Sequence, residues 1–322
     1  MKRVYLDWNA SEPLSERAYT AMIHSLQQYG NPSSTHFEGR EARNALEKAR
    51  DRIAEIVGIP SRHSIVFTSG ATEAASMILH SHPFKCALIE HDCVKVWAEH
   101  YLEVSESGLV IVNDPGSSSL QMANSETGII QDVPDGILLT DAVQAFGKIC
   151  IDFSNIGYEF AVISSHKIGG PKGIGALLGK DTSSIEPLIK GGGQEAGLRS
   201  GTENLTNVLG FTAAVEDRLV AIKSGIQVEI EKKRDYLERM LKEVNPETII
   251  VGEAVNRLPN TSYFITRGWK GDLQVAGLDL EGFSVSSGMI LGPSLVCWSC
   301  SGVVWEHLEA VRKCLGTISG YL

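Results

Sequence analysis

Two hydrophobic patterns alternate along the first two thirds of the chain. Continuous apolar runs are typical of strands buried in a sheet, and apolar residues spaced three or four apart are typical of amphipathic helices. Strands that alternate with helices predict an α/β fold with a mostly parallel sheet. The predicted helices span 39–57, 71–80 and 93–103, and the predicted strands span 63–68, 86–90, 119–123, 136–141, 159–164 and 174–178.

The pattern changes after residue 222. A long, highly charged amphipathic helix is predicted at 226–244, and it is followed by strands at 248–253, 260–266 and 282–287 and a helix at 304–315. This change indicates a large α/β domain over residues 14–222 and a smaller α+β domain formed by residues 1–13 and 223–322.

Composition narrows the class of protein. With 322 residues, of which 43% are hydrophobic, the chain can bury a sizeable core. Its net charge of −10 argues against a surface that binds nucleic acid, and it has no signal-like start and no run near the roughly 18 apolar residues of a membrane span. Six cysteines in a chain of this length are not a disulfide framework. We therefore expect a cytoplasmic protein that acts on small molecules.

Chemically distinctive side chains follow three of the predicted strands. Lys167 comes after the strand at 159–164, Asp141 ends the strand at 136–141, and a small-residue turn at 69–75 follows the strand at 63–68. Ligands bind at the carboxyl edge of such sheets. Taken singly, Asp141 reads as the cap of the next helix and the turn as an ordinary strand–helix junction. Together they fit pyridoxal phosphate, which needs a lysine amine, a carboxylate at its ring nitrogen and a helix N-terminus for its phosphate.

Seven sequence blocks resemble the cysteine desulfurases of the class-V aminotransferase family, and they occur in the family's order over most of the chain. The blocks are "YLDWNASEP" (5–13), "GNPSSTH" (30–36), "FTSGATEAA" (67–75), "EH" (90–91), "DAVQAFGK" (141–148), "SSHKIGGPKGIGAL" (164–177) and "GGGQEAGLRSGTEN" (191–204). The resemblance implies a fold-type-I enzyme dependent on pyridoxal phosphate, with a large domain carrying a mostly parallel, seven-stranded type of sheet and a smaller α+β C-terminal domain. It also implies a dimer that removes sulfur from L-cysteine and leaves alanine, for sulfur transfer or iron–sulfur cluster supply.

The resemblance also implies roles for individual residues. Lys167 would form the Schiff base with the cofactor, Asp141 would contact the pyridine nitrogen, and His91 would stack on the ring. Gln144 would bind the ring oxygen, and Asn31 would line the substrate side. The remaining residues implied to bind the cofactor are Ala71, Thr72, Ser164 and His166, with Ser125 in a place where the family usually has asparagine and Thr202 reaching in from the neighbouring subunit.

Two further positions depart from the family where sulfur chemistry takes place. The family carries its catalytic cysteine on a loop that corresponds to "SVSSGMILGPSLV" (284–296); that loop is shorter here, and residues 288–294 include no thiol. The family's arginine that binds the substrate carboxylate aligns with Cys297, whose thiol cannot form the paired bonds of a guanidinium. Cys297 and Cys300 form a C-x-x-C pair, which we interpret as two half-buried residues on a strand, and we expect no metal site.

Three functions therefore stay open. The first is a desulfurase-like enzyme that acts on L-cysteine, or on a related amino acid, with its persulfide step impaired or rerouted. The second is a non-catalytic or partner-dependent subunit that pairs with a true desulfurase in a heterodimer. The third is an aminotransferase or lyase for another amino acid. A desulfurase would also need a sulfur-acceptor or scaffold protein as a partner.

Overall fold

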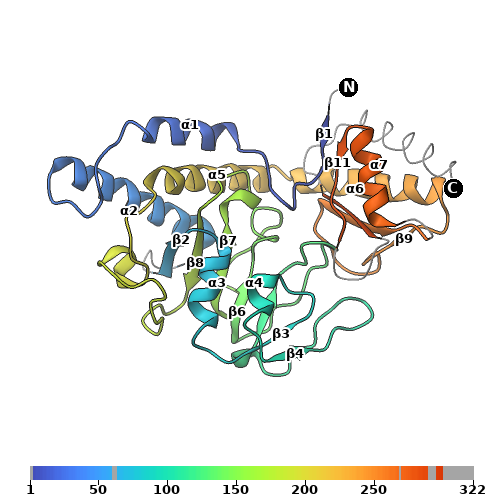
Figure 1. The fold of residues 1–322 in the computed structure, drawn as a ribbon, viewed down its shortest axis with the longest axis horizontal. Coiled ribbons are helices and arrows are strands. Elements are labelled where there is room, and N and C mark those ends of the chain that lie inside the picture. The colour runs from blue at the N-terminus through green and yellow to red at the C-terminus, as the bar shows by residue number, and fades with distance from the viewer. Residues whose placement is uncertain (1–2, 60–63, 268–269, 289–294, 300–322) are drawn as a thin grey trace. The chain divides into compact units, whose positions relative to one another are not determined.

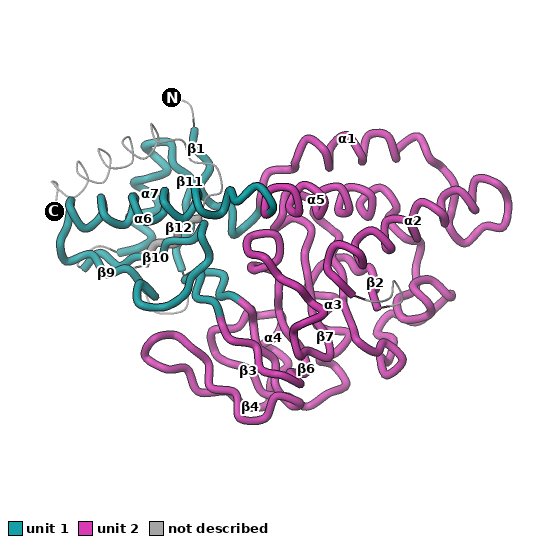
Figure 2. The backbone as a smooth tube through the Cα atoms, turned by 180° about the vertical axis from the view of Figure 1, so that it is seen from behind, with its two compact units in different colours: residues 1–11, 123–130, 223–322 teal, residues 12–122, 131–222 magenta. Residues whose placement is uncertain are grey.

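The computed structural model describes residues 3–59, 64–267, 270–288 and 295–299, the last of these as backbone only. The chain divides into two compact units, which Figure 2 shows in different colours. Residues 12–122 and 131–222 form the larger unit, and residues 1–11, 123–130 and 223–322 form the smaller one.

The larger unit is built on a central sheet. The strands of this unit are β2 (Ile65–Thr68), β3 (Lys85–Ala87), β4 (His100–Leu102), β5 (Ser119–Gln121), β6 (Ile137–Asp141), β7 (Tyr158–Ser164) and β8 (Gly175–Gly179). Five of them follow the order β2–β8–β7–β6–β5, and a parallel bridge from Lys85 to Ser118 places the parallel pair β3–β4 beside β5. Among these described strands only β8 runs antiparallel to its neighbours, so the prediction of a mostly parallel sheet is confirmed.

Helices pack on both faces of this sheet (Figure 1). The helices of this unit are α1 (Glu16–Ser25), α2 (Phe37–Val57), α3 (Ala71–Leu79), α4 (Asp92–Lys95) and α5 (Leu205–Lys223), with short 3₁₀ turns η2 (Pro115–Ser117), η3 (Ser165–Lys167) and η4 (Gln194–Gly197). Val66 of β2 packs in one core with Ala74 and Ile78 of α3. The ring of the next residue, Phe67, instead lies 4.7 Å from the guanidinium of Arg50 in α2. Because successive strand side chains point to opposite faces, α2 and α3 lie on opposite faces of the sheet.

Local signals set the ends of the longest of these helices. The ring nitrogen Nδ1 of His36 accepts the backbone N–H of Gly39 at 3.3 Å, which caps the start of α2. At the other end Gly58 has φ +78°, a left-handed conformation that side-chain-bearing residues seldom adopt. The predicted helix at 39–57 therefore starts two residues earlier and ends as expected.

The smaller unit has its own core. Its elements are β1 (Val4–Tyr5), α6 (Ile226–Val244), β9 (Ile249–Ile250), β10 (Thr261–Ile265), α7 (Gly271–Leu280), β11 (Phe283–Ser284) and β12 (Leu295–Ser299). Strand β10 lies between β9 and β12 and is antiparallel to both, and β1 pairs with β11 in parallel. Leu237 of α6, Phe264 of β10 and Leu278 of α7 meet in this core, and the helix predicted at 226–244 is confirmed at both ends.

Some predicted elements were wrong. The helix expected at 93–103 ends at Lys95, and residues 100–102 form β4 instead. The physical reason is that Val94 is buried while Val96 and Tyr101 are exposed, so the apolar residues of this segment share no helical face. The strand expected at 86–90 ends at Ala87, and the strand expected at 248–253 covers only Ile249–Ile250. Helices α1, α5 and α7 were not predicted. The helix expected at 304–315 lies outside the described residues.

Candidate functional site

The predicted strand-end residues lie at one edge of the central sheet. Ser164 of β7 and Thr68 of β2 both pair with Gly175 of β8, which lies between them. Asp141 is the last residue of β6, the parallel neighbour of β7, and Lys167 follows three residues after β7 in the turn η3. Parallel strands bring their carboxyl ends to the same edge, so these three strand ends form one neighbourhood.

Two glycines shape this edge. A Cβ added to Gly175 would lie 2.8 Å from the carbonyl carbon of Gly70 and 2.8 Å from the oxygen of Ile163, so the backbones approach as closely as only glycine allows. At Gly70, which precedes α3, an added Cβ would meet nothing within 4 Å. The surroundings of Gly70 are therefore uncrowded. Ala71 and Thr72 occupy the first two positions of α3, whose N–H groups have no partner inside a helix.

Asp141 is a buried carboxyl group with cations near it. Burial raises the pKa of Asp141, while a bond from the N–H of Val143 (2.8 Å) and the nearby charges of His91 and Lys167 lower it. A further cation bound against this carboxylate would favour its ionised form. The protonated ring nitrogen of pyridoxal phosphate is such a cation, so the carboxylate of Asp141 fits this cofactor.

His91 is oriented by the short helix that follows it. It precedes α4, and its Nδ1 accepts the N–H of Cys93 at 3.2 Å, so in the neutral ring the proton is on Nε2. The thiol of Cys93 lies beside the hydroxyl of Thr72, and burial raises the pKa of this thiol to about 12. Thr72 and His91 are exposed next to the buried Asp141, which leaves the stacking role expected for His91 sterically open.

Gln144 and His166 also have defined surroundings. The Nζ of the buried Lys148 donates to Oε1 of Gln144 at 2.6 Å, which fixes the amide oxygen of Gln144 toward Lys148 and leaves its amide nitrogen as the donor of that group. Burial and the charge of Lys167 lower the pKa of His166 to about 4, so its ring is neutral at pH 7. Lys148 belongs to the sequence block at 141–148, but no role was predicted for it.

The backbone on both sides of Lys167 is held by hydrogen bonds. The carbonyl oxygen of His166 accepts the N–H of Glu12 at 2.9 Å, and the carbonyl oxygen of Ile168 accepts Nε of Arg218 at 3.1 Å. Glu12 and Arg218 form an ion pair with each other. This arrangement fixes the turn that carries Lys167. Neither Glu12 nor Arg218 was predicted as a site residue, because the two are far apart in the sequence and only the fold brings them together.

The other expected site residues lie in different surroundings. Asn31 is exposed, and its Oδ1 accepts the N–H of Ser33 at 2.9 Å in a local turn. Thr202 is exposed in the segment before α5. Ser125 belongs to the smaller unit, where its carbonyl oxygen accepts Nδ2 of Asn9 at 3.1 Å.

Glu90 is a buried carboxyl group that sequence reasoning missed. Its Oε1 accepts the N–H of Gln121 at 2.7 Å, and no hydrogen-bond partner of Oε2 is present among the described residues. Burial raises the pKa of Glu90 well above its ordinary value, and the nearby charge of Asp141 acts in the same direction. Burial thus acts toward the neutral form of Glu90, which would spare the neighbouring Asp141 a second negative charge. The block "EH" was the available signal, but it drew attention to the histidine alone.

The described part of the chain contains two thiols near the site, and neither they nor a metal site extend its chemistry. Burial raises the pKa of both Cys86 and Cys93 to about 12, so neither is a thiolate at neutral pH. In residues 3–59, 64–267 and 270–288 no group of three or more His, Cys, Asp or Glu side chains is placed to hold a metal ion. The backbone of Cys297 lies in β12 opposite Tyr263, but its side chain, Cys300 and the substituted loop at 289–294 lie outside the described residues.

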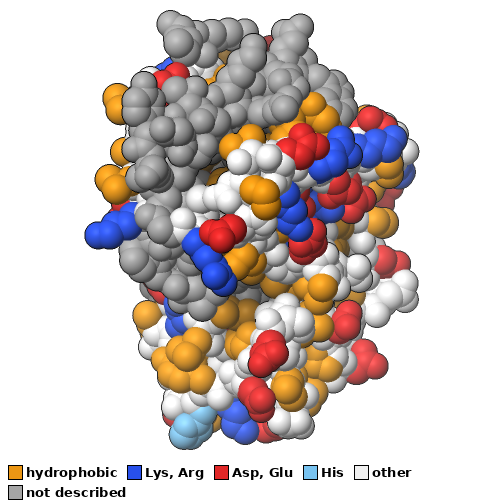
Figure 3. Space-filling model, turned by 90° about the vertical axis from the view of Figure 1, so that its right-hand side faces the viewer, with side chains coloured by type: hydrophobic (Ala, Val, Ile, Leu, Met, Phe, Trp, Pro, Cys, Tyr) orange, Lys and Arg blue, Asp and Glu red, His pale blue; other side chains and the backbone are white. Residues whose placement is uncertain are grey.

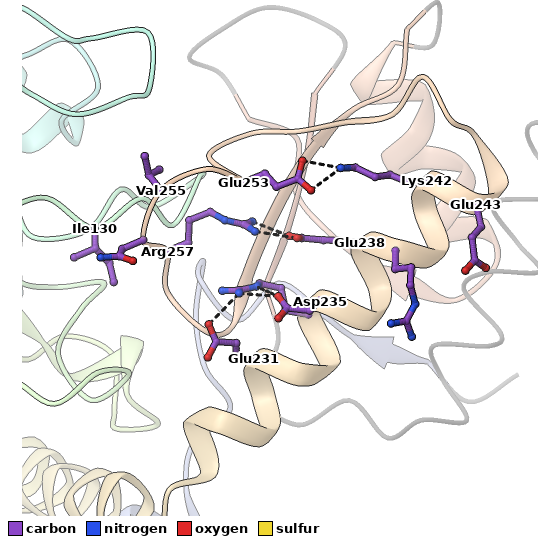
Figure 4. Close-up of a pocket in the computed structure, with 12 residues that line it drawn as sticks. Ile130, Glu231, Asp235, Glu238, Lys242, Glu243, Glu253, Val255 and Arg257 are labelled. Atoms are coloured by element: carbon purple, nitrogen blue, oxygen red, sulfur yellow. Dashed lines mark hydrogen bonds and ion pairs between the residues drawn. The ribbon is translucent and has the colours of Figure 1, made fainter.

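A separate pocket of about 800 Å³ lies along α6 in the smaller unit (Figure 4). Its charges neutralise one another: Arg257 makes bonds of 2.7 and 2.9 Å to Glu238, and Lys242 lies 2.6 Å from both oxygens of Glu253. Acidic and basic side chains are intermingled on the face that Figure 3 shows. These contacts indicate a solvated, internally paired surface and do not favour a ligand of one charge.

Comparison with known proteins gives consistent matches. The family model of class-V aminotransferases matches residues 4–100 and 89–309. A cysteine desulfurase IscS from Dictyoglomus turgidum is 34% identical over 89% of this chain and 82% of its own length, and a selenocysteine lyase from Bos taurus is 32% identical over 99% and 90%. Among solved structures, a NifS-like protein from Rickettsia africae superposes with a TM-score of 0.92 at 31% identity, covering 99% of both chains. No helix within the described residues is long and apolar enough to cross a membrane.

Proposed function

Because this chain belongs to the class-V aminotransferase family, whose members in general depend on pyridoxal phosphate, we propose that it binds this cofactor through Lys167 and acts on L-cysteine. The observation that carries the proposal is the placement of Lys167 beside a buried Asp141 at the carboxyl edge of the sheet. The cofactor, when bound, supplies an electron sink for the bonds around the amino acid's α-carbon.

The chain's own residues would each do one task around that group. Asp141 would keep the ring nitrogen protonated, because a buried carboxylate favours an adjacent cation. The N-terminus of α3, with Thr72, would hold the phosphate, and the neutral His166 would add a hydrogen bond without adding charge. The bonds from Glu12 and Arg218 would keep Lys167 within reach of substrate.

The substrate's sulfur would be transferred to a thiol, and the loop at 284–296 does not provide one. A thiolate R–S⁻ that attacks the substrate sulfur gives a persulfide R–S–S⁻, and the electron pair of the broken carbon–sulfur bond ends in alanine after protonation. Residues 288–294 contain no cysteine, and the thiols of Cys86 and Cys93 are protonated at pH 7. We propose an external acceptor, either a small thiol or the cysteine of a partner protein. The alternative acceptors within the chain are the C-x-x-C pair Cys297 and Cys300 and the exposed Cys150.

This proposal predicts that alanine formation depends on added thiol. With purified, cofactor-loaded protein and L-cysteine, a second thiol such as dithiothreitol is expected to raise the rate of alanine release about tenfold, since without a thiolate the sulfur has no nucleophile to accept it. The substrate's own thiol sets the background, so L-cysteine is kept at a constant, low concentration. A rate that does not change with the thiol would contradict an external acceptor.

A related amino acid is a second candidate substrate. The similarity to a selenocysteine lyase favours a test with selenocysteine, whose leaving group departs more readily than that of cysteine. Comparison of kcat/KM for the two amino acids would decide between them, with L-alanine as a control that binds but has no group to lose. A partner-dependent, non-catalytic subunit stays a third candidate, because the exposed Thr202 segment is retained while the loop cysteine is not.

We propose that the chain forms a dimer through α1. Its buried face carries Ala18 and Ser25. Tyr19 and Ile23 of α1 and the C-cap residue Leu26 lie four and three residues apart and expose 52%, 44% and 67% of their surface. An apolar stripe of this kind on a helix is typical of an interaction surface, and cysteine desulfurases are typically dimeric.

The dimer proposal predicts the effect of Ile23→Asp. A charge in the middle of this stripe is expected to raise the dimer dissociation constant at least ~100-fold, since burying an unpaired charge in an interface costs several kcal/mol. Sedimentation velocity over a range of concentrations measures this constant. Val228→Asp, at an exposed apolar residue of α6, is the matched control and should leave it unchanged. Equal dissociation constants for the two variants would contradict the proposal.

A further inference from the structure

Two turns of the larger unit that are far apart in sequence are joined by ion pairs. The first, here named the phosphate turn, comprises residues 68–73, from the last residue of β2 into the first turn of α3. The second, here named the crossing turn, comprises residues 194–202 and ends on Thr202. On the proposed function, the phosphate turn serves the subunit's own cofactor, and Thr202 serves the cofactor of the other subunit.

The first link is a buried pair that reaches the backbone just before the phosphate turn. Arg50 donates through Nη1 and Nη2 to the two carboxylate oxygens of Glu195, both at 2.7 Å, and Oε2 of Glu195 also accepts the N–H of Phe67 at 2.8 Å. Glu195 is thus bonded at once to α2 and to β2. It holds the first half of the crossing turn against the strand that leads into the phosphate turn.

The second link joins the two turns directly. Nε and Nη2 of Arg199 lie 2.8 and 3.4 Å from the oxygens of Glu73, and Oε2 of Glu73 also accepts the N–H of Ser69 at 2.7 Å. Burial acts to raise the pKa of Glu73, but the bonds from Arg199 and Ser69 lower it below its ordinary value, so this carboxylate is charged. One carboxylate therefore fixes the backbone of the phosphate turn and the side chain of the crossing turn.

The crossing turn needs such support because its backbone is strained. Glu195 and Ala196 have φ angles of +49° and +57°, in the left-handed region that residues with side chains seldom adopt. Conformations of this kind persist where surrounding contacts determine them, and here Glu195 and Arg199 provide those contacts.

We propose that Glu73 and Arg199 form a positioning pair that serves two cofactor sites at once. The pair holds the phosphate turn of its own subunit and, through the crossing turn, holds Thr202 in place for the other subunit's site. This inference rests on the proposed function, because it requires a cofactor at the phosphate turn and a dimer in which Thr202 crosses over.

The first test measures cofactor affinity and does not depend on catalysis. Cofactor-free protein is titrated with pyridoxal phosphate, and the visible absorbance of the Lys167-bound form reports binding. Arg199→Gln is expected to raise the dissociation constant about tenfold, as the loss of one charge-assisted hydrogen-bonded pair does, and Arg199→Lys to raise it less. Lys190→Gln removes an exposed ion pair with Glu186 nearby and should change nothing. Circular dichroism melts of each variant check that it folds, and an unchanged affinity in folded Arg199→Gln overturns the proposal.

The second test separates the two sites with mixed dimers of differently tagged chains, in which one chain carries Lys167→Ala so that only one site gives absorbance. Arg199→Gln is placed either on the chain with the working lysine or on the chain without it. Both placements should weaken binding about threefold, because independent contributions add as free energies. Weakening in the first placement only, or failure of mixed dimers to form, overturns the two-site claim. A wild-type protein without lysine-dependent absorbance would instead contradict the proposed function itself.

Discussion

Lys167→Ala is expected to abolish the absorbance band of the lysine-bound cofactor and to lower alanine formation from L-cysteine by on the order of 10⁵-fold. The magnitude is that seen when the covalent nucleophile of an enzyme is removed, which costs roughly 7 kcal/mol of transition-state stabilisation. Lys167 lies in η3, where the backbone on both sides is held by Glu12 and Arg218, so the substitution should leave the fold intact. Absorbance spectra and an alanine assay on the same preparations measure both effects.

Lys172→Ala is the matched control for this experiment. Lys172 lies five residues further on in the same segment, and its side chain is exposed. Its loss should leave the spectrum and the rate close to those of the unmodified protein. If Lys167→Ala kept a normal spectrum, the cofactor proposal would be wrong; if it lost the spectrum while alanine release continued, the enzyme chemistry would reside elsewhere.

Asp141→Asn is expected to lower the rate of alanine formation by about 10³-fold while the protein still folds. The amide oxygen of asparagine can accept the N–H of Val143 as the carboxylate does, so the local turn is kept. What is lost is the negative charge that keeps the ring nitrogen of the cofactor protonated, and removal of one such electrostatic partner costs about 3–4 kcal/mol.

The control for Asp141→Asn is the same substitution at an aspartate that is exposed rather than buried. Asp135→Asn, in the loop before β6, removes an exposed charge. It should leave the rate within a factor of two. A loss of less than tenfold in Asp141→Asn, measured as kcat/KM with saturating cofactor, would show that Asp141 does not act on the ring nitrogen.

The sequence was informative where one local pattern decides the structure. Apolar runs such as the one before Lys167 led to β6 and β7, because a run that is buried on both faces leaves few alternatives to a central strand. The helix at 226–244 was found with its ends, because its polar and apolar faces repeat regularly. The resemblance to class-V aminotransferases and the α/β fold are both confirmed, whereas the roles assigned to single residues stay predictions.

Local patterns failed where tertiary contacts decide. The segment at 93–103 has the composition of a helix, yet pairing of β4 with β3 turns its second half into a strand. Helix α5 was missed because its sequence is apolar on most sides, so it has little periodicity to detect. The buried Glu90 could not be recognised, since its burial depends on β5, where Gln121 donates to it.

By itself, the sequence determined that strands and helices alternate in the larger unit, which family the chain belongs to, and that residues 288–294 hold no thiol. These features depend on residue types and on short spacings, which the chain displays directly. Only the tertiary structure decided that Arg199 meets Glu73 and that Arg50 meets Glu195, pairs separated by 126 and 145 residues. An ion pair of this kind depends on how the sheet brings distant turns together, and nothing in the spacing of either partner encodes that distance.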